Sequence, residues 1–210
     1  MTLFRRFKIE QDFAEKFLSA DKIFTVWPTY AWKIIDYGIA RCPSWSTLLD
    51  VSDITTLSQE EQEVLAFSML PLICRGRAKG MRGKCSFKCS LEAFIDLKPE
   101  GTDLEYYINQ IDRKTRPQPF ILIIGGSRTK PLQTFVIVER QGVLCSTMTK
   151  AIDYALKLHY VLDVVYQEQC FAAWQFLQSV VYQLPGDATS SSVPGVTPIV
   201  ACTPSAIINF

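Results

Sequence analysis

The chain has 210 residues, of which 48% are hydrophobic and 20% charged, and its formal net charge is +1. This composition is typical of a globular protein that buries a sizeable core. A net charge near zero excludes an overall field that would draw the protein to nucleic acid or to a membrane surface. No stretch approaches the roughly 18 consecutive apolar residues that a membrane helix needs.

The N-terminus and the cysteines indicate a soluble intracellular protein. Arg5, Arg6 and Lys8 interrupt the N-terminus, so the apolar run of a signal peptide does not form there. The chain has seven cysteines, an odd number, and they are scattered along the sequence. We therefore expect reduced thiols in the cytoplasm or the nucleus, and we do not expect secretion.

Two helices are predicted near the start of the chain. Apolar residues recur at four-residue spacing across residues 9–20, with charged residues between them. An aromatic cluster follows, in which Pro28 is expected to open a second helix. That helix is expected to end near Ile39, since Gly38 and Pro43 mark its end.

A third helix is predicted from a capping box. Glu61 follows Ser58 by three residues, and the first turn is acidic. The helix should continue to about Leu70, where Pro71 is expected to kink or end it. Residues 1–74 are therefore predicted to be a helical region.

A basic segment interrupts the pattern between residues 75 and 88, which hold three glycines and no acidic residue. Its six cations are Arg75, Arg77, Lys79, Arg82, Lys84 and Lys88. The other 16 basic residues of the chain are outnumbered by 21 acidic ones, so this segment offsets an acidic body. We predict an exposed basic loop over 75–89, with three open alternatives: a solvated loop without a partner, a nuclear import signal, or a site for nucleic-acid phosphates.

Strands are predicted in the second half of the chain. They cover residues 91–97, 120–124, 134–139 and 143–145, and the last two are joined by a hairpin turn at 141–142. The run Phe120–Ile124 is continuously apolar, which is typical of a central strand buried on both faces.

Helices are predicted among these strands, over residues 103–114, 148–160 and 168–183. Thr102 or Asp103 is expected to cap the first of them, and Thr147 the second. From residue 185 the composition shifts to Pro, Gly, Ser and Thr without periodicity, so 185–210 is predicted to be a disordered tail. The fold class is therefore α+β: N-terminal helices, then in 90–184 a small, mainly antiparallel sheet packed with two C-terminal helices.

No catalytic residue, metal site or cofactor site is predicted. His159 is the single histidine, and it lies on the apolar face of its helix, so we interpret it as a core residue. Asp153 and Asp163 are the carboxylates considered for acid–base chemistry, with nothing in the sequence to bring them together. The glycines of the basic segment and those at 125–126 lack the strand, spacing or helix of a phosphate loop.

A zinc site is the weaker metal hypothesis. Cys85 and Cys89 are four residues apart, and Cys74 lies upstream. A structural zinc site needs four ligands, usually in two close pairs. Cys42 alone would have to complete the set, so zinc is not expected.

Several short motifs carry a resemblance to a known family. They are Trp27, Pro28 and Trp32; Leu70 and Pro71; Ser90, Ala93, Phe94, Asp96, Pro99 and Gly101; Gln118 to Leu122; Phe135 to Val138; Lys150 to Asp153; Tyr160 to Asp163; and Trp174 to Gln178. Between residues 10 and 184 the chain resembles a set of vertebrate proteins that includes sterile-alpha-motif-domain-containing-3-like proteins. The resemblance implies no activity and no catalytic residue, and residues after Pro185 depart from the family pattern.

These observations favour a non-enzymatic interaction module with an unknown protein partner. The alternative is a nucleic-acid-associated protein that binds phosphates through the basic loop 75–88. An enzyme with carboxylate chemistry is a remote third hypothesis. No membrane association is expected.

Overall fold

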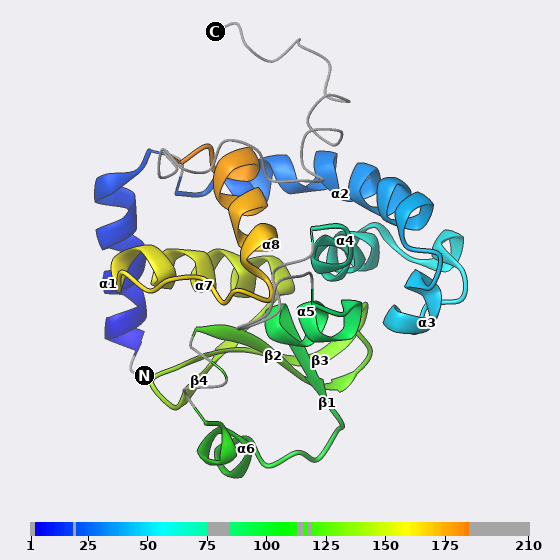
Figure 1. The fold of residues 1–210 in the computed structure, drawn as a ribbon. Helices are drawn as coiled ribbons and strands as arrows, with labels where there is room; N and C mark the ends of the chain where they lie inside the picture. Colours follow the sequence, from blue (N-terminus) through cyan, green and yellow to red (C-terminus); the bar gives the residue numbers. More distant parts are fainter. Residues whose placement is uncertain (1–2, 19, 75–84, 113–115, 117–118, 185–210) are drawn as a thin grey trace, which may run out of the picture.

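The computed structural model describes residues 3–18, 20–74, 85–112, 116 and 119–184. Figure 1 shows a sheet with most of the helices gathered on one of its faces and one short helix, α6, beneath the other. Residues 75–84 of the predicted basic loop and the whole predicted tail, 185–210, lie outside the described residues. The class is α+β, as predicted.

The sheet has four strands in the order β1-β2-β3-β4. Their bounds are β1 Ile95–Lys98, β2 Phe120–Gly126, β3 Pro131–Val138 and β4 Gln141–Cys145. β2 pairs on both sides, which confirms it as a central strand. β1 runs parallel to β2, whereas the other two pairings are antiparallel, so the sheet is mixed and the prediction of a mainly antiparallel sheet is wrong. The crossover that contains α6 (Leu104–Gln110) brings the chain back in the parallel direction.

The strand predicted over 91–97 is wrong in its first half. A helix, α5 (Phe87–Phe94), occupies these residues, and β1 begins at Ile95. Ser86 starts the helix, because its Oγ accepts a hydrogen bond from the backbone N–H of Cys89 at 3.1 Å. The last three residues of the predicted basic loop, 87–89, therefore belong to a helix.

The hairpin between β3 and β4 turns two residues earlier than predicted. Glu139 and Arg140 form the turn, with φ of 49° and 59°, and Gln141 and Gly142 already belong to β4. Two consecutive left-handed residues are typical of a two-residue turn that matches the twist of the flanking strands. Gly142 does not form the turn; it lies in β4 close to α6, where a Cβ would lie 2.8 Å from the end of the Leu104 side chain.

The N-terminal helices are α1 Leu3–Lys16, α2 Lys22–Arg41, α3 Trp45–Leu49 and α4 Gln59–Ile73, with a 3₁₀ turn, η1, at Ile54–Thr56. The predicted start of the second helix is wrong, since α2 begins before Pro28 and continues through it. Pro71 likewise lies inside α4, two residues before its end. The capping box is confirmed: Ser58 Oγ accepts from Glu61 N, and Glu61 accepts from Ser58 N.

Close packing joins α2 to α4. The rings of Trp27 and Phe67 stack with their centroids 3.8 Å apart. Further along, Gly38 lies close to Met69: a Cβ at residue 38 would lie 2.7 Å from the Met69 sulfur, and the Met69 side chain would have to move to accommodate it. Among the described helices, none is long and apolar enough to cross a membrane.

The C-terminal helices are α7 Met148–Val161 and α8 Phe171–Phe176, and a π-helical turn, η2, follows at Leu177–Val181. Thr147 caps α7 as predicted, with its hydroxyl accepting from Lys150 N at 3.2 Å. The helix predicted over 168–183 is wrong at its start, because α8 begins at Phe171, and in its second half, which is the π-helical turn. In the π-helical turn the backbone N–H of Tyr182 donates to Leu177 O, five residues back. The side chain of Tyr182 then reaches α7, where its hydroxyl donates to Asp153.

Two hydrophobic clusters lie on the two faces of the sheet. The larger one joins the N-terminal helices to the sheet and to α7, through residues such as Phe13, Trp27, Phe67, Ile121 and Ile152. Residues 3–74 therefore share one core with the second half of the chain. The smaller cluster fills the space between the other face and α6, and consists of Ile108, Phe120, Leu122, Ile124, Phe135 and Ile137.

Candidate functional site

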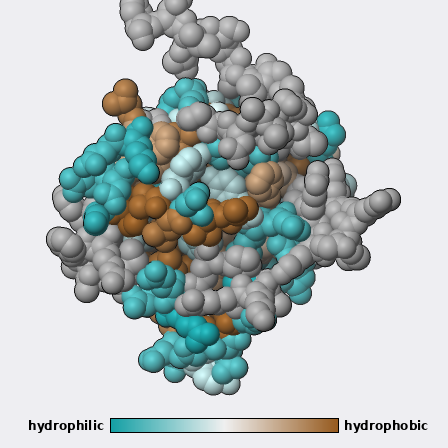
Figure 2. Space-filling view, turned by 60° about the vertical axis from the view of Figure 1, so that its left-hand side comes forward, coloured by the Kyte–Doolittle hydropathy of each residue, from teal (hydrophilic) through white to brown (hydrophobic). Residues whose placement is uncertain are grey.

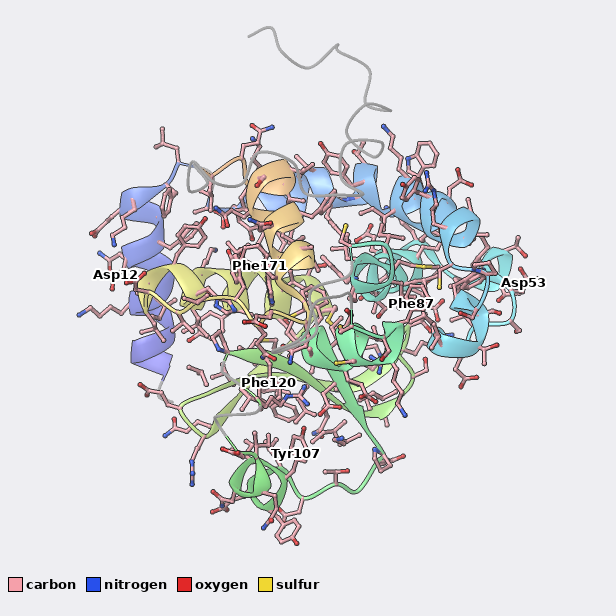
Figure 3. The ribbon with its side chains drawn as sticks, viewed as in Figure 1. Asp12, Asp53, Phe87, Tyr107, Phe120 and Phe171 are labelled. Carbon is pink, nitrogen blue, oxygen red and sulfur yellow. The ribbon has the colours of Figure 1, made fainter. Side chains whose placement is uncertain are left out.

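A shallow cavity of about 310 Å³, largely open to solvent, lies between α5, Arg116 and the α7–α8 connection, which is residues 162–170. Its lining is Ser86, Lys88, Cys89, Glu92, Ala93, Arg116, Gln167 and Gln169. Figure 3 places Phe87, at the start of α5, and Phe171, at the start of α8, on the same side of the sheet. Polar and apolar atoms contribute about equally to its surface, and six of the eight lining residues have polar side chains, so this cavity is the candidate site for recognition of a group with polar and apolar parts.

The first turns of α5 form one wall of the cavity. Lys88 is exposed, and its Nζ lies 3.9 Å from the carboxylate of Glu92, one turn along the same helix. Lys88 is the one member of the six predicted basic residues that the described structure includes. Arg75, Arg77, Lys79, Arg82 and Lys84 all lie outside the described residues.

Arg116 forms a second wall and is held from three sides. Its Nη1 donates to Asp96 Oδ2 at 2.9 Å, and its Nη2 donates to the carbonyl of Glu92 at 2.7 Å. The guanidinium also lies 4.0 Å from the ring of Phe120. These contacts orient the side chain at the edge of the cavity.

Asp96, at the base of this arrangement, collects further partners. The hydroxyl of Tyr107 donates to it, and Lys98 Nζ lies 3.3 Å from its other oxygen. Tyr107 lies on the side of α6 that faces the sheet (Figure 3). Burial and the bond to Asp96 raise the pKa of Tyr107, so its hydroxyl stays protonated and donates at neutral pH.

Arg128 reaches the same region from the turn between β2 and β3. Its Nη1 donates to the carbonyl of Ile95 at 2.9 Å, and the residue is buried. Burial lowers the pKa of Arg128, while the nearby carboxylates of Asp96 and Glu92 oppose that shift. The guanidinium thus fastens the β2–β3 turn to the start of β1.

The α7–α8 connection forms the third wall, and its backbone ties it to the rest of the fold. The carbonyl of Gln169 accepts from Ser90 Oγ on α5 at 2.8 Å, and the carbonyl of Val164 bonds to His159 Nδ1 on α7 at 2.9 Å. The ring of Tyr166 stacks on Trp174, with centroids 5.9 Å apart. The connection is therefore held in a defined conformation beside the cavity.

Apolar side chains of this segment and of the first residue of α8 are exposed to solvent. Val165 is 79% exposed, and Leu162 and Phe171 are also exposed. Figure 2 brings the α1 side of the molecule forward and shows a band of hydrophobic side chains across that face. We call Leu162, Val165 and Phe171 the apolar rim. The same short segment thus supplies polar lining to the cavity and apolar side chains to the surface.

His159 is a core residue, as predicted. It is buried, and its ring lies 4.6 Å from that of Tyr166 and 5.3 Å from that of Trp174. Burial lowers its pKa to about 4, although the bond to the Val164 carbonyl opposes this. The neutral ring must donate from Nδ1 to that carbonyl, which fixes its tautomer.

The carboxylates considered for acid–base chemistry have different surroundings. Asp153 is buried and accepts hydrogen bonds from Lys157 at 2.8 Å and from Tyr182. Asp163 is exposed, at the left-handed residue that follows α7. The structure therefore does not bring the two carboxylates to one solvent-facing site.

The described residues contain no group of three or more His, Cys, Asp or Glu side chains arranged to hold a metal ion. Comparison of the chain with protein-family models, with curated proteins and with solved structures finds no match. The resemblance to sterile-alpha-motif-domain-containing-3-like proteins therefore stays a prediction.

Sequence reasoning missed the main components of the cavity. Arg116 lies beside prolines in a segment without periodicity, and Gln167 and Gln169 lie between two helices. Asp96 carried the one usable signal, because an acidic residue between Ile95 and Leu97 in an apolar run needs a buried partner. Nothing in the sequence identified Arg116 as that partner.

Proposed function

We propose that this chain is a non-enzymatic intracellular interaction module that binds a protein partner at the apolar rim and the adjoining cavity. The observation that carries this proposal is that the α7–α8 connection supplies both exposed apolar side chains and polar side chains that line the cavity. It presents Leu162 and Val165 to solvent, and it places Gln167 and Gln169 in the wall of the cavity. Apolar contacts supply affinity to a recognition surface, and a few fixed polar groups orient the ligand.

The energetics suit a modest interface. Full burial of one Val, Leu or Phe side chain contributes roughly 1.5–3 kcal/mol. The connection is already held by Ser90 and His159, so a partner meets an ordered surface and loses little entropy in fixing it. The groups that acid–base chemistry would use, His159 and Asp153, are bound within the fold, and this favours a binding role.

Affinity purification with a surface variant tests this proposal. Tagged wild-type chain, Val165→Asp and Leu144→Asp are compared after nuclease treatment. Leu144 is a matched control, since it is a 57% exposed apolar residue on β4, away from the rim. We expect partners that survive nuclease to be lost with Val165→Asp and retained with Leu144→Asp. Identical partners for all three proteins would contradict the proposal.

Nucleic-acid binding is the second candidate, and the position of Lys88 favours it. Lys88, the last of the six predicted cations, lies at the cavity beside Arg116. This function predicts binding that weakens steeply with salt and falls when Arg75, Arg77, Arg82 and Lys84 are changed together to Gln. If this quadruple variant binds nucleic acid as tightly as the parent, the alternative is wrong. Partners that disappear on nuclease treatment would favour it over the protein-binding proposal.

A further inference from the structure

Two cysteines flank the start of α5. Cys85 directly precedes the capping residue Ser86, and Cys89 occupies the first turn, where its backbone N–H is bound by Ser86 Oγ. At a capped helix start the side chain before the cap packs against the first turn. Cys85 follows this rule, because its Sγ lies 2.9 Å from Ser90 Oγ. The side chains of Cys85 and Cys89 also interact directly, so the two thiols are held on one side of the same turn.

The two thiols differ in access. Cys85 is buried, and its Sγ also lies 3.7 Å from the carbonyl of Gln169. Cys89 is exposed and lines the cavity, and the other five described cysteines are buried. A reagent that enters the cavity therefore meets Cys89 first and finds Cys85 behind it.

We propose that Cys85 and Cys89 form a redox-active dithiol, which a hydroperoxide oxidises to a disulfide across the first turn of α5. In the first step the Cys89 sulfur attacks the peroxide, the O–O bond breaks, and Cys89 becomes a sulfenic acid while one water leaves. In the second step the Cys85 sulfur attacks the Cys89 sulfur, the S–S bond forms, and the S–O bond breaks with release of a second water. Two thiols and one hydrogen peroxide thus give one disulfide and two waters.

The surroundings favour Cys85 over Cys170 as the resolving thiol. Cys170 is fully buried, and burial raises its pKa to about 12. Cys85 and Cys89 interact directly: partial burial first, and then the Cys85 thiol and Glu92, raise the pKa of Cys89. Oxidation should therefore be slow at neutral pH and faster in alkali, where the thiolate forms. Lys88 and Arg116 are the cations that face this pair from the cavity wall.

The disulfide would also change the cavity. The Cys85 sulfur now contacts Ser90 and the carbonyl of Gln169, which join α5 to the α7–α8 connection. Bonding to Cys89 draws that sulfur toward the cavity and removes its contacts to the connection. The dithiol is therefore a modification site in its own right, whether or not the proposed partner exists.

Peptide mapping of the full chain after treatment with hydrogen peroxide tests the dithiol. Trypsin cleaves after Lys84 and Lys88, so the peptide Cys85–Lys88 stays joined to the next peptide only through the proposed disulfide. We expect this linked pair in the wild type, its loss on reduction, and a faster yield at about pH 9 than at about pH 7. Cys170→Ser is the matched control and should give the same linked pair.

The single variants separate the two thiols. Cys89→Ser should leave Cys85 reduced, and Cys85→Ser should accumulate a sulfenic acid at Cys89 that dimedone labels. A disulfide between Cys85 and Cys170, a link between two chains, or overoxidation of wild-type Cys89 with Cys85 still reduced would overturn the proposal. Circular dichroism of each variant shows whether it is folded, and the wild-type map decides the outcome if a variant is not.

Discussion

Two carboxylate clusters in this fold have the same chemistry and different surroundings. The enclosed cluster is Asp153 with Lys157 and Tyr182, and the open cluster is Asp96 with Tyr107, Arg116 and Lys98. Each holds a carboxylate between a tyrosine hydroxyl and a cation. Both carboxylates are buried, with the side chain of Asp153 7% exposed and that of Asp96 3%, but the cations differ: Lys157 is 4% exposed, whereas Arg116 and Lys98 are 20% and 35% exposed.

This difference in exposure indicates what each cluster does in the fold. Burial raises the pKa of Asp153 even though Lys157 and Tyr182 oppose the shift. Burial of the enclosed pair therefore has a desolvation cost, which its mutual attraction, the Tyr182 hydrogen bond to Asp153 and the Asp21 carboxylate near Lys157 offset, and the cluster fixes α7 against the C-terminal segment. The cations of the open cluster are partly exposed to solvent, and the cluster lies at the edge of the cavity, where it orients Arg116.

The largest expected effect follows from removal of the enclosed cation. Lys157→Met leaves Asp153 buried without its counter-ion, which should lower the free energy of unfolding by about 3–5 kcal/mol. Urea denaturation measures this change. Lys150→Met is the control, because Lys150 is an exposed lysine on the same helix and its loss should change stability by less than about 0.5 kcal/mol.

A double variant tests whether the unpaired buried charge of Asp153 causes the loss of stability in Lys157→Met. Asp153→Asn together with Lys157→Met removes both charges, so most of the lost stability should return. If Lys157→Met behaves like Lys150→Met, the enclosed pair contributes nothing and the contrast between the clusters is wrong.

The second prediction concerns the pH dependence of the same helix. The pKa of His159 is lowered to about 4 by burial, from an ordinary value of 6.5. The unfolded chain therefore binds a proton more readily than the folded chain, and stability is lost as pH falls from about 6.5 to about 4. The lost contribution is about 3 kcal/mol, and His159→Gln should remove it.

The comparison of His159→Gln with the wild type isolates this group. Asp153 changes stability in the opposite direction. Its pKa in the folded chain is raised above the ordinary value of 3.8, so the folded state gains stability as pH falls toward 3.8. Unfolding free energies measured at several pH values for both proteins give the difference directly. Parallel curves would show that His159 is not held neutral in the fold.

Local signals allowed part of this fold to be predicted from sequence. The capping box at Ser58 and the cap at Thr147 each depend on neighbours within three residues, and both are present. Of the two caps considered for α6, Thr102 and Asp103, Asp103 is the one that caps the helix. The central strand Phe120–Ile124 was also recognisable, since a strand buried on both faces is apolar throughout.

The rest depended on contacts between distant parts of the chain. Asp153 and Tyr182 are 29 residues apart, and Asp96 and Arg116 are 20 apart, so no local pattern pairs them. The same holds for the cavity, whose walls come from three separate segments. Helix α5 was missed because Leu91 and Phe94 suit a strand as well as a helix, and the cap at Ser86 lay within the basic segment.

The third prediction concerns the open cluster. Arg116→Met removes the bonds to Asp96 and to the Glu92 carbonyl, but Lys98 and the hydroxyl of Tyr107 remain in contact with the carboxylate. The expected loss of unfolding free energy is about 1–2 kcal/mol, less than half of that for Lys157→Met. Denaturation of both variants under the same conditions gives the ratio, and equal losses would remove the distinction between the clusters.

The smallest expected effect comes from Lys98, which is the closest match to Lys157. Each lysine pairs with an aspartate and lies over an aromatic ring, at 5.2 Å from Tyr107 for Lys98 and 5.8 Å from Phe13 for Lys157. Because Lys98 is partly exposed, Lys98→Met should cost only about 0.5 kcal/mol, and about 1 M salt should abolish that cost. The effect of Lys157→Met should persist in the same salt, since solvent ions do not reach a buried pair. A salt-resistant loss at Lys98 would place both lysines in the same low-dielectric environment and would contradict the contrast in exposure that separates the two clusters.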